Sequence, residues 1–173
     1  MKILTFALAT LFSLNTLCSA AYWSSGDYHC EINLPDGTPR TDKYWVATGS
    51  TEEGTLVGSR RVDLQGYIFF GFVDLRKNPK LHLNEKTIPE LEKRFIPVSE
   101  GFHHTLQRIV TNRIPGYRIT GSRVLYDQHF TMVMDMYEAN NLIYQVVGMK
   151  QGTDDPMKDG DIRSCMESFR LKN

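Results

Sequence analysis

The segment 130–171 constrains the fold more than any other part of the chain. It begins with two apolar runs that are joined by Asn140 and Asn141. Asparagine tolerates the positive φ angles that both central residues of a type I′ turn require. A two-residue turn at this point pairs Ala139 with Leu142, and this pairing fixes which residues of the two runs lie opposite one another. The sequence therefore predicts an antiparallel hairpin with a defined register.

The predicted hairpin is apolar on one face and mixed on the other, because side chains alternate along a strand. The apolar face carries Met132, Met134, Met136, Ile143, Val147 and Met149, and the mixed face carries Val133, Asp135, Tyr137, Leu142, Tyr144 and Val146. A sheet that is apolar on one side and partly apolar on the other is expected to be covered on both sides.

The N-terminal residues 1–20 have the pattern of a secretory signal peptide. Lys2 is followed by the apolar run 3–14, and small residues ending at Ala20 suit cleavage. The apolar run is too short to span a bilayer, so we expect no transmembrane segment after cleavage. The mature chain, 21–173, is of a size typical of one domain, and a signal peptide directs it to a secreted or periplasmic location.

The cysteine pattern follows from this cleavage. Cys18 leaves with the signal peptide, and Cys30 and Cys165 remain as an even pair in an oxidising compartment. A disulfide between them is the first expectation, and two buried free thiols are the alternative. A loop of this length would contribute about 4 kcal/mol on the chain-entropy model.

The rest of the chain predicts an α+β fold, in which strands, a helix, more strands and a last helix follow one another. A capping-box pattern begins the first helix at Thr87, and Pro97 ends it. A second helical segment is expected from Ser99 to about residue 106, and Pro115-Gly116 is expected to be a turn. The predicted strands are 27–34, 43–48, 55–62, 67–75, 109–114 and 117–126 together with the hairpin, and the last helix is 161–167.

Four short motifs resemble the PsbP/Mog-like superfamily. They are Ile32-Asn33-Leu34-Pro35, Pro115-Gly116-Tyr117, Asn141-Leu142-Ile143-Tyr144-Gln145-Val146 and Ser168-Phe169-Arg170-Leu171. The resemblance implies an α-β-α sandwich around a central antiparallel sheet. It also implies a binding or assembly protein without catalytic residues, because the family's known members act in that way. No disulfide can be carried over from the family to Cys30 and Cys165.

The charge balance excludes one broad class of partner. The formal net charge is zero, which argues against a general nucleic-acid binder. Arg60 and Arg61, with Arg76-Lys77 nearby, are the candidates for a basic patch, although a solvated face is the favoured interpretation. Tyr137 and Tyr144 on the mixed hairpin face complete the candidate binding surface.

Metal and cofactor binding have little support in the sequence. Adjacent His103 and His104 point in different directions on a helix, and no His-Glu-x-x-His motif is present. The acidic segment 154–161 fits an EF-hand loop poorly, because Met157 and Met166 occupy ligand positions. We therefore expect no cofactor.

Catalytic motifs are also missing from the sequence. The chain has no Gly-x-Ser-x-Gly motif and no glycine-rich phosphate loop. The leading hypothesis is a secreted or periplasmic, non-catalytic binding or assembly protein with an unidentified protein partner. Two alternatives stay open: a binder of a small apolar or lipid-like ligand on the aromatic face, with Phe69 or Phe70, and a hydrolase whose site no motif reveals.

Overall fold

The computed structural model describes residues 21–34, 40–45, 53–60, 66–95, 103–125 and 127–172. The predicted signal peptide lies outside these ranges. The strands are β1 (Ala21–Ser25), β2 (Cys30–Leu34), β3 (Arg40–Trp45), β4 (Glu53–Arg60), β5 (Gly66–Asp74), β6 (His103–Thr111), β7 (Ile114–Leu125), β8 (Gln128–Ala139), β9 (Leu142–Gln151) and β10 (Arg170–Leu171). The helices are α1 (Ile88–Phe95) and α2 (Gly160–Ser168), with the 3-10 turn η1 (Pro156–Lys158) between β9 and α2.

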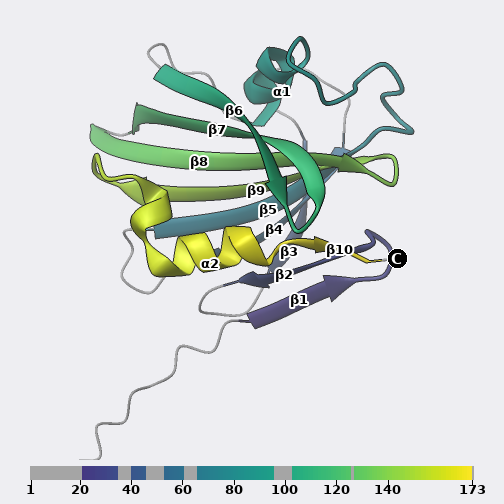
Figure 1. Ribbon diagram of the computed structural model, residues 1–173, viewed down its shortest axis with the longest axis horizontal. Helices are drawn as coiled ribbons and strands as arrows, with labels where there is room; N and C mark the ends of the chain where they lie inside the picture. Colours follow the sequence, from purple (N-terminus) through teal and green to yellow (C-terminus); the bar gives the residue numbers. More distant parts are fainter. Residues whose placement is uncertain are drawn as a thin grey trace, which may run out of the picture.

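The described strands form two antiparallel sheets (Figure 1). The larger has seven strands in the order β3-β4-β5-β9-β8-β7-β6, and the smaller has three in the order β1-β2-β10. Strand β5 lies inside the larger sheet between β4 and β9, as its nearly continuous apolar sequence predicts. The small sheet joins the two ends of the described chain, because β10 pairs with β2.

The β8–β9 hairpin has the predicted turn and register. Asn140 and Asn141 have φ angles of 53° and 59°, as a type I′ turn requires. Ala139 lies opposite Leu142, as expected from the two-residue turn. The alternation along these strands therefore divides the core into two clusters, one on each face of the large sheet.

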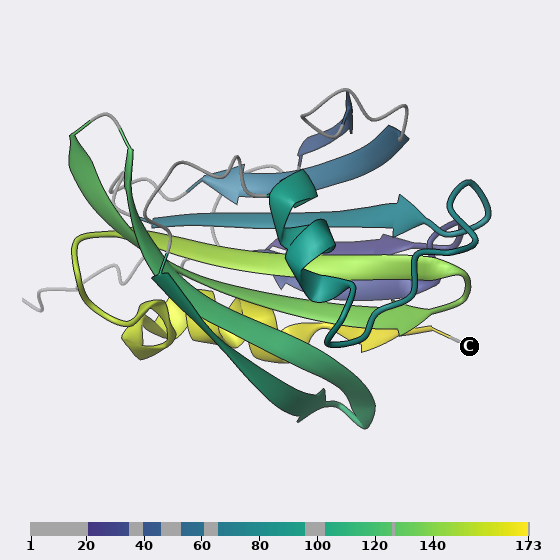
Figure 2. The same ribbon diagram turned by 90° about the horizontal axis from the view of Figure 1, so that it is seen from above.

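Each face of the large sheet is covered by different elements (Figure 2). On one face the methionines of β8 pack with the α1 side chains Ile88 and Leu91. On the other face α2 and the small sheet cover the aromatic residues of β5, β8 and β9. The fold is α+β, but within the described residues one short helix lies on each face, so the expected α-β-α sandwich is not confirmed.

The β6–β7 hairpin differs from the sequence prediction. Residues 103–106 lie in strand β6 and not in a helix, and the turn is Asn112-Arg113, with φ angles of 50° and 69°. Pro115 and Gly116 lie inside β7. Proline is tolerated here because β8 pairs with β7 only from Gly116 onward, so no ladder hydrogen bond is lost.

The turn of this hairpin is fastened to the C-terminal end of α2. The Asn112 side chain donates hydrogen bonds to the carbonyl oxygens of Glu167 (2.9 Å) and Phe169 (2.8 Å). The last carbonyl groups of a helix lack partners within the helix, and one side chain here satisfies two such groups. The turn of the hairpin therefore lies at the C-terminal end of α2 (Figure 1).

Candidate functional site

A groove of about 480 Å³ lies between α2 and the outer face of the small sheet. Its lining residues are Tyr22, Glu31, Ile32, Asn33, Gly160, Arg163, Ser164, Glu167, Ser168 and Arg170. They come from β1, β2, α2 and β10, so the two ends of the described chain build the groove together.

The small sheet presents a polar outer face because its strands alternate. Cys30 and Ile32 of β2 point into the core, whereas Glu31 and Asn33 point outward into the groove. Arg170 of β10 lies opposite Glu31. This face of β2 therefore carries groups that can meet a partner.

Tyr22 is the exposed aromatic side chain of the groove. It lies on β1 and is 62% exposed. Its hydroxyl donates a 2.6 Å hydrogen bond to Glu31 Oε2, and this bond raises the pKa of the tyrosine. The bond holds the ring against the sheet face, and an exposed, oriented tyrosine is common in protein interfaces.

The opposite wall of the groove is the outward face of α2. Arg163 and Ser164 lie three and four residues after Gly160 and four and three residues before Glu167, which places these residues on one side of the helix. The Asp159 carboxylate caps this helix by accepting hydrogen bonds from the N–H groups of residues 161 and 162. The wall therefore starts at a well-fixed helix end.

Ser168 connects the two walls. Its hydroxyl oxygen accepts a hydrogen bond from the Asn33 N–H (2.9 Å) and donates one to the Cys165 carbonyl (2.6 Å). The groove thus has a fixed width where α2 ends.

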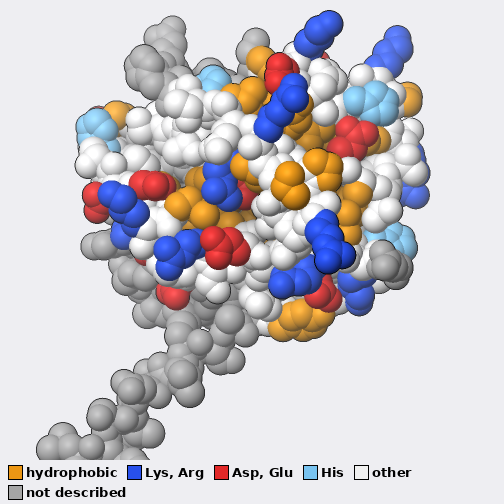
Figure 3. Space-filling view, in the orientation of Figure 1, with side chains coloured by type: hydrophobic (Ala, Val, Ile, Leu, Met, Phe, Trp, Pro, Cys, Tyr) orange, Lys and Arg blue, Asp and Glu red, His pale blue; other side chains and the backbone are white. Residues whose placement is uncertain are grey.

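On the face drawn in Figure 3, acidic and basic side chains are interspersed without a large region of one sign.

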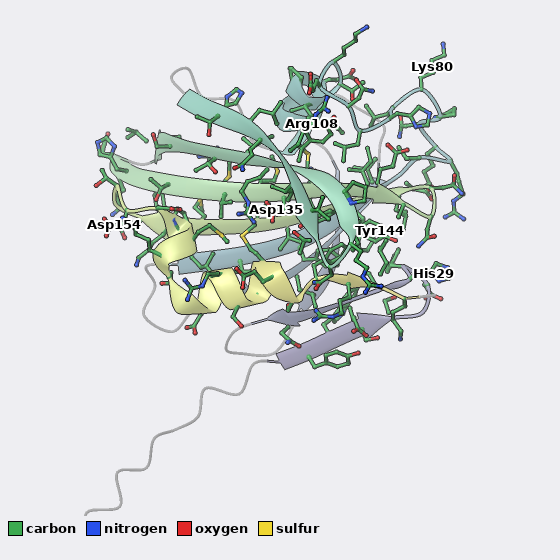
Figure 4. All side chains as sticks on the ribbon, in the orientation of Figure 1. His29, Lys80, Arg108, Asp135, Tyr144 and Asp154 are labelled. Atoms are coloured by element: carbon green, nitrogen blue, oxygen red, sulfur yellow. The ribbon has the colours of Figure 1, made fainter. Side chains whose placement is uncertain are left out.

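A buried ion pair joins β7 and β8 on the face of the large sheet that α2 covers, and Figure 4 labels its Asp135. Asp135 is completely buried and accepts two 2.7 Å hydrogen bonds from the Arg118 guanidinium and a third, of 3.2 Å, from the Tyr137 hydroxyl. Burial raises the pKa of Asp135, and the hydrogen bonds from Arg118 oppose this effect. All three residues are held by their own contacts, so we assign this cluster to the core.

The predicted binding surface does not form around the two tyrosines. Tyr137 and Tyr144 are both 0% exposed, so they belong to the core and not to a surface. Arg61 lies outside the described residues, as does the side chain of Arg60. The prediction failed for the tyrosines because α2 and the small sheet, which are distant in sequence, cover the mixed face of the hairpin.

The neighbouring cations of the predicted patch are placed near the end of β5. Arg76 pairs with Asp74, with 2.7 Å between Nη2 and Oδ2. Lys77 is exposed. The charge of Arg76 is therefore balanced by Asp74.

The aromatic face is filled by packed rings, which counts against an apolar or lipid-like ligand there. The ring centroids of Tyr137 and Phe169 are 4.9 Å apart in a stacked arrangement, and those of Tyr144 and Phe169 are 5.4 Å apart. Phe70 lies 5.7 Å from Phe169. Phe169, at the end of α2, therefore occupies the position in which such a ligand would have to lie.

The expected disulfide is absent, because Cys30 and Cys165 are buried free thiols. Cys30 lies opposite Leu171, whereas α2 meets β2 at Asn33, where the Ser168 side chain binds. Three residues of strand span about 10 Å. Cys165 lies one helical turn before Ser168, farther from Cys30. The distance between the Cα atoms of Cys30 and Cys165 therefore exceeds the limit of roughly 7 Å for a disulfide. Counting cysteines identified the pair but could not give this distance.

Both thiols are expected to resist alkylation in the native protein at neutral pH. Burial raises the pKa of Cys30 and of Cys165 to about 12 from the ordinary value of 9.0, and this lowers the thiolate fraction about 1000-fold. Iodoacetamide labelling of the mature chain, which lacks Cys18, followed by intact-mass measurement should add no label to the folded protein and two labels in denaturant. A mass gain of two hydrogens on reduction would instead reveal a disulfide.

The histidine and aspartate candidates are dispersed or have structural contacts. His82 Nδ1 lies 2.9 Å from Glu138 Oε1, and His104 and His129 are exposed on separate strands. The Asp155 and Asp159 carboxylates cap η1 and α2. Within the described ranges, no group of three or more His, Cys, Asp or Glu side chains is placed to hold a metal ion.

The groove was not anticipated from the sequence. Glu31 and Asn33 alternate with apolar residues, and Arg163 and Glu167 share a helix face, so each wall had a recognisable pattern. Their meeting depends on the pairing of β10 with β2, which joins residues far apart in the chain.

The α+β fold is similar to that of PsbP. The solution structure of cyanobacterial PsbP (CyanoP) from Synechocystis sp. PCC 6803 is similar, with a TM-score of 0.57 and 10% identity over 95% of this chain and 98% of that chain. The resemblance expected from the motifs is therefore confirmed for the fold.

Two other solved structures show weaker similarity. PA94 from Pseudomonas aeruginosa, a protein of unknown function described as a putative regulator, has a TM-score of 0.49 and 8% identity over 89% of this chain and 98% of that chain. LpqN, involved in cell envelope biogenesis of Mycobacterium tuberculosis, has a TM-score of 0.40 and 9% identity over 79% and 86% of the two chains. Neither a protein-family model nor a curated protein sequence matches the chain. In the described part of the chain, no helix is both long and apolar enough to cross a membrane.

Proposed function

We propose that this chain is an exported, non-catalytic binding protein whose groove between α2 and the small sheet receives a segment of a partner protein. The observation that supports the proposal is the groove itself. Its volume of about 480 Å³ and its lining by tyrosine, arginine and glutamate side chains suit recognition of a polypeptide.

The placement of the perturbed ionisable groups supports a role without catalysis. Catalytic groups with strongly shifted pKa values normally lie in a cleft where they can reach a substrate. Here Cys30, Cys165, Tyr137 and Tyr144 have raised pKa values because they are buried, and none of them lines the groove. Tyr22 does line the groove and also has a raised pKa, but the cause is its hydrogen bond to Glu31, so its hydroxyl stays protonated at neutral pH. These positions support a groove used for contacts rather than for proton or acyl transfer.

Export is supported by the N-terminal sequence pattern. Lys2, the apolar run 3–14 and the small residues before Ala20 are the parts of a signal peptide. Strand β1 begins at Ala21, so cleavage after Ala20 would leave the described fold whole. N-terminal sequencing of the protein recovered from its natural compartment tests this step.

Charge reversal at Arg163 should weaken capture of the partner. Arg163 is exposed on the α2 wall, and arginine is often a residue on which binding affinity depends. We expect Arg163→Glu to weaken binding by about tenfold or more. The measurement is affinity capture from the native extracytoplasmic fraction with the mature chain, followed by titration of the captured protein.

The matched control for this experiment is Lys158→Glu. Lys158 is exposed on η1 next to α2 but does not line the groove, so the same change of net charge occurs outside the site. Wild type and Lys158→Glu should capture the same protein equally. Equal capture by Arg163→Glu would contradict a binding site in the groove.

A second variant changes the shape of the groove without changing its charge. A Cβ added at Gly160 meets nothing within 4 Å, so Gly160→Ala leaves the free protein undisturbed and places a methyl group at the groove. Gly26→Ala, where a Cβ also meets nothing within 4 Å, is the control in the β1–β2 turn. Weaker binding by Gly160→Ala alone is the expected result.

A further inference from the structure

Among the strands that the structure describes, β6 forms an edge of the large sheet, and its outer side has no neighbouring strand. The two-residue turn Asn112-Arg113 closes the hairpin at the pair Thr111 and Ile114, and in such a hairpin this closing pair is hydrogen-bonded. Every second residue of β6 then bonds to β7. The N–H and C=O groups of Leu106, Arg108 and Val110 therefore point away from β7.

This edge lacks the usual protection against pairing. Proteins protect edge strands with several charges, prolines, bulges or short lengths, whereas β6 has nine residues, no proline and a single formally charged side chain, Arg108. In Figure 2 the hairpin curves away from the body of the molecule, with β6 on its outer side. The edge is thus open to another strand.

The side chains beside this edge are unusually apolar for an exposed strand. Leu106 and Val110 lie on the same face of β6 and are 41% and 73% exposed. Arg108 lies between them and donates hydrogen bonds of 3.0 and 2.7 Å to Glu85 Oε1. The pattern is an apolar residue, a paired charge and a second apolar residue.

We propose that β6 pairs antiparallel with β6 of a second copy of this chain, about a twofold axis at Arg108. In this register Leu106 of each copy lies opposite Val110 of the other, so both exposed apolar side chains gain an apolar neighbour. The open N–H and C=O groups of Leu106, Arg108 and Val110 complete the hydrogen-bond ladder. The two large sheets then form one continuous sheet.

The charges at the axis are complementary within this arrangement. The two Arg108 side chains approach one another, but each carries its Glu85 partner. The axis therefore brings together two Arg108–Glu85 ion pairs and not two isolated cations. Registers centred on Gln107 or Leu106 would place Arg108 opposite Leu106 or His104, and each would lose the paired Leu106–Val110 contacts.

A second copy fits this edge because the pattern is self-complementary. The same strand supplies both members of each apolar pair, and each copy brings its own Arg108–Glu85 ion pair to the axis, as an isologous twofold contact requires. This inference concerns the surface at β6 and is independent of the groove. The groove variants at Arg163 and Gly160 leave it unchanged.

The first test is sedimentation velocity of the mature chain at several micromolar concentrations. We expect a concentration-dependent dimer in the wild type and a dissociation constant raised tenfold or more in Val110→Lys. Val124→Lys is the matched control, because Val124 is a valine that is 50% exposed on β7 and pairs with β8 away from the free edge. A wild-type chain that stays monomeric, or equal weakening by both variants, would overturn the proposal.

The second test reads the register by oxidation of single cysteines placed at 106, 107 or 108. Hydrogen-bonded antiparallel partners have Cα atoms about 5.5 Å apart, which suits a disulfide. The buried native thiols stay unreactive. Arg108→Cys should form a covalent dimer fastest. Faster crosslinking of Leu106→Cys or Gln107→Cys, or none above the rate of Val124→Cys, would refute this register.

Discussion

Replacing Asp135 with alanine should lower the free energy of unfolding by about 3–5 kcal/mol. The carboxylate is fully buried, and its loss leaves the Arg118 guanidinium and the Tyr137 hydroxyl without their shared acceptor. A partly buried cation without a counter-charge is expensive, and this accounts for most of the effect. For a domain of this size the melting temperature should fall by about 6–20 °C, measured by thermal denaturation with circular dichroism.

The matched control is Asp74→Ala. Asp74 also accepts hydrogen bonds from both Nε and Nη2 of an arginine, Arg76, but that arginine is 74% exposed. Solvent can replace the lost partner there, so the melting temperature should change little. Equal effects at Asp135 and Asp74 would show that burial does not decide the cost.

A double replacement separates the charge from the packing. In Arg118→Leu with Asp135→Leu, both charges are removed and apolar side chains fill part of the space. Buried ion pairs can often be replaced in this way at little or no cost in stability. We expect the double variant to recover most of the stability that Asp135→Ala loses. A double variant as unstable as the single one would mean that the pair acts through its shape and hydrogen bonds.

The parts of the fold that sequence predicts are those fixed by neighbouring residues. In the β8–β9 hairpin, Asn140 and Asn141 determine the turn and the alternation determines the faces, so both turn and register are correct. In the β6–β7 hairpin the strongest local turn signal, Pro115-Gly116, lies within a strand. Its true turn contains Arg113 in a left-handed conformation, which few sequence rules would assign to arginine.

The parts that sequence does not predict depend on which distant segments meet. Tyr144 was expected at a surface because its strand face is mixed, but α2 and the small sheet bury that face. Cys30 and Cys165 were expected to bond because they are an even pair, but β10 pairs with β2 in a register that keeps them apart. The groove is formed by the same pairing. Alternation therefore predicted the two faces of the hairpin but not the elements that cover them or the groove.

Replacing Gly116 with alanine should destabilise the protein by about 3 kcal/mol or more. A Cβ at Gly116 would lie 2.4 Å from the carbonyl oxygen of Met136 and 2.6 Å from Cδ1 of Tyr137. Both residues belong to β8, which pairs with β7 at this point. Relief would require the two strands to separate, and that would also disturb the contact between Tyr137 and Phe169. Chemical denaturation followed by tryptophan fluorescence measures the loss.

Two other glycines distinguish a backbone obstacle from a side-chain obstacle. At Gly148 the nearest atom to an added Cβ is Ile162 Cγ2 on α2, at 2.4 Å, so Ile162→Ala should relieve part of the strain of Gly148→Ala. At Gly26 nothing lies within 4 Å, and Gly26→Ala should leave stability unchanged. The obstacle at Gly116 includes a backbone carbonyl, which no side-chain replacement removes. Unfolding of Gly116→Ala at the same denaturant concentration as Gly26→Ala would contradict the close approach of β7 and β8 at Gly116.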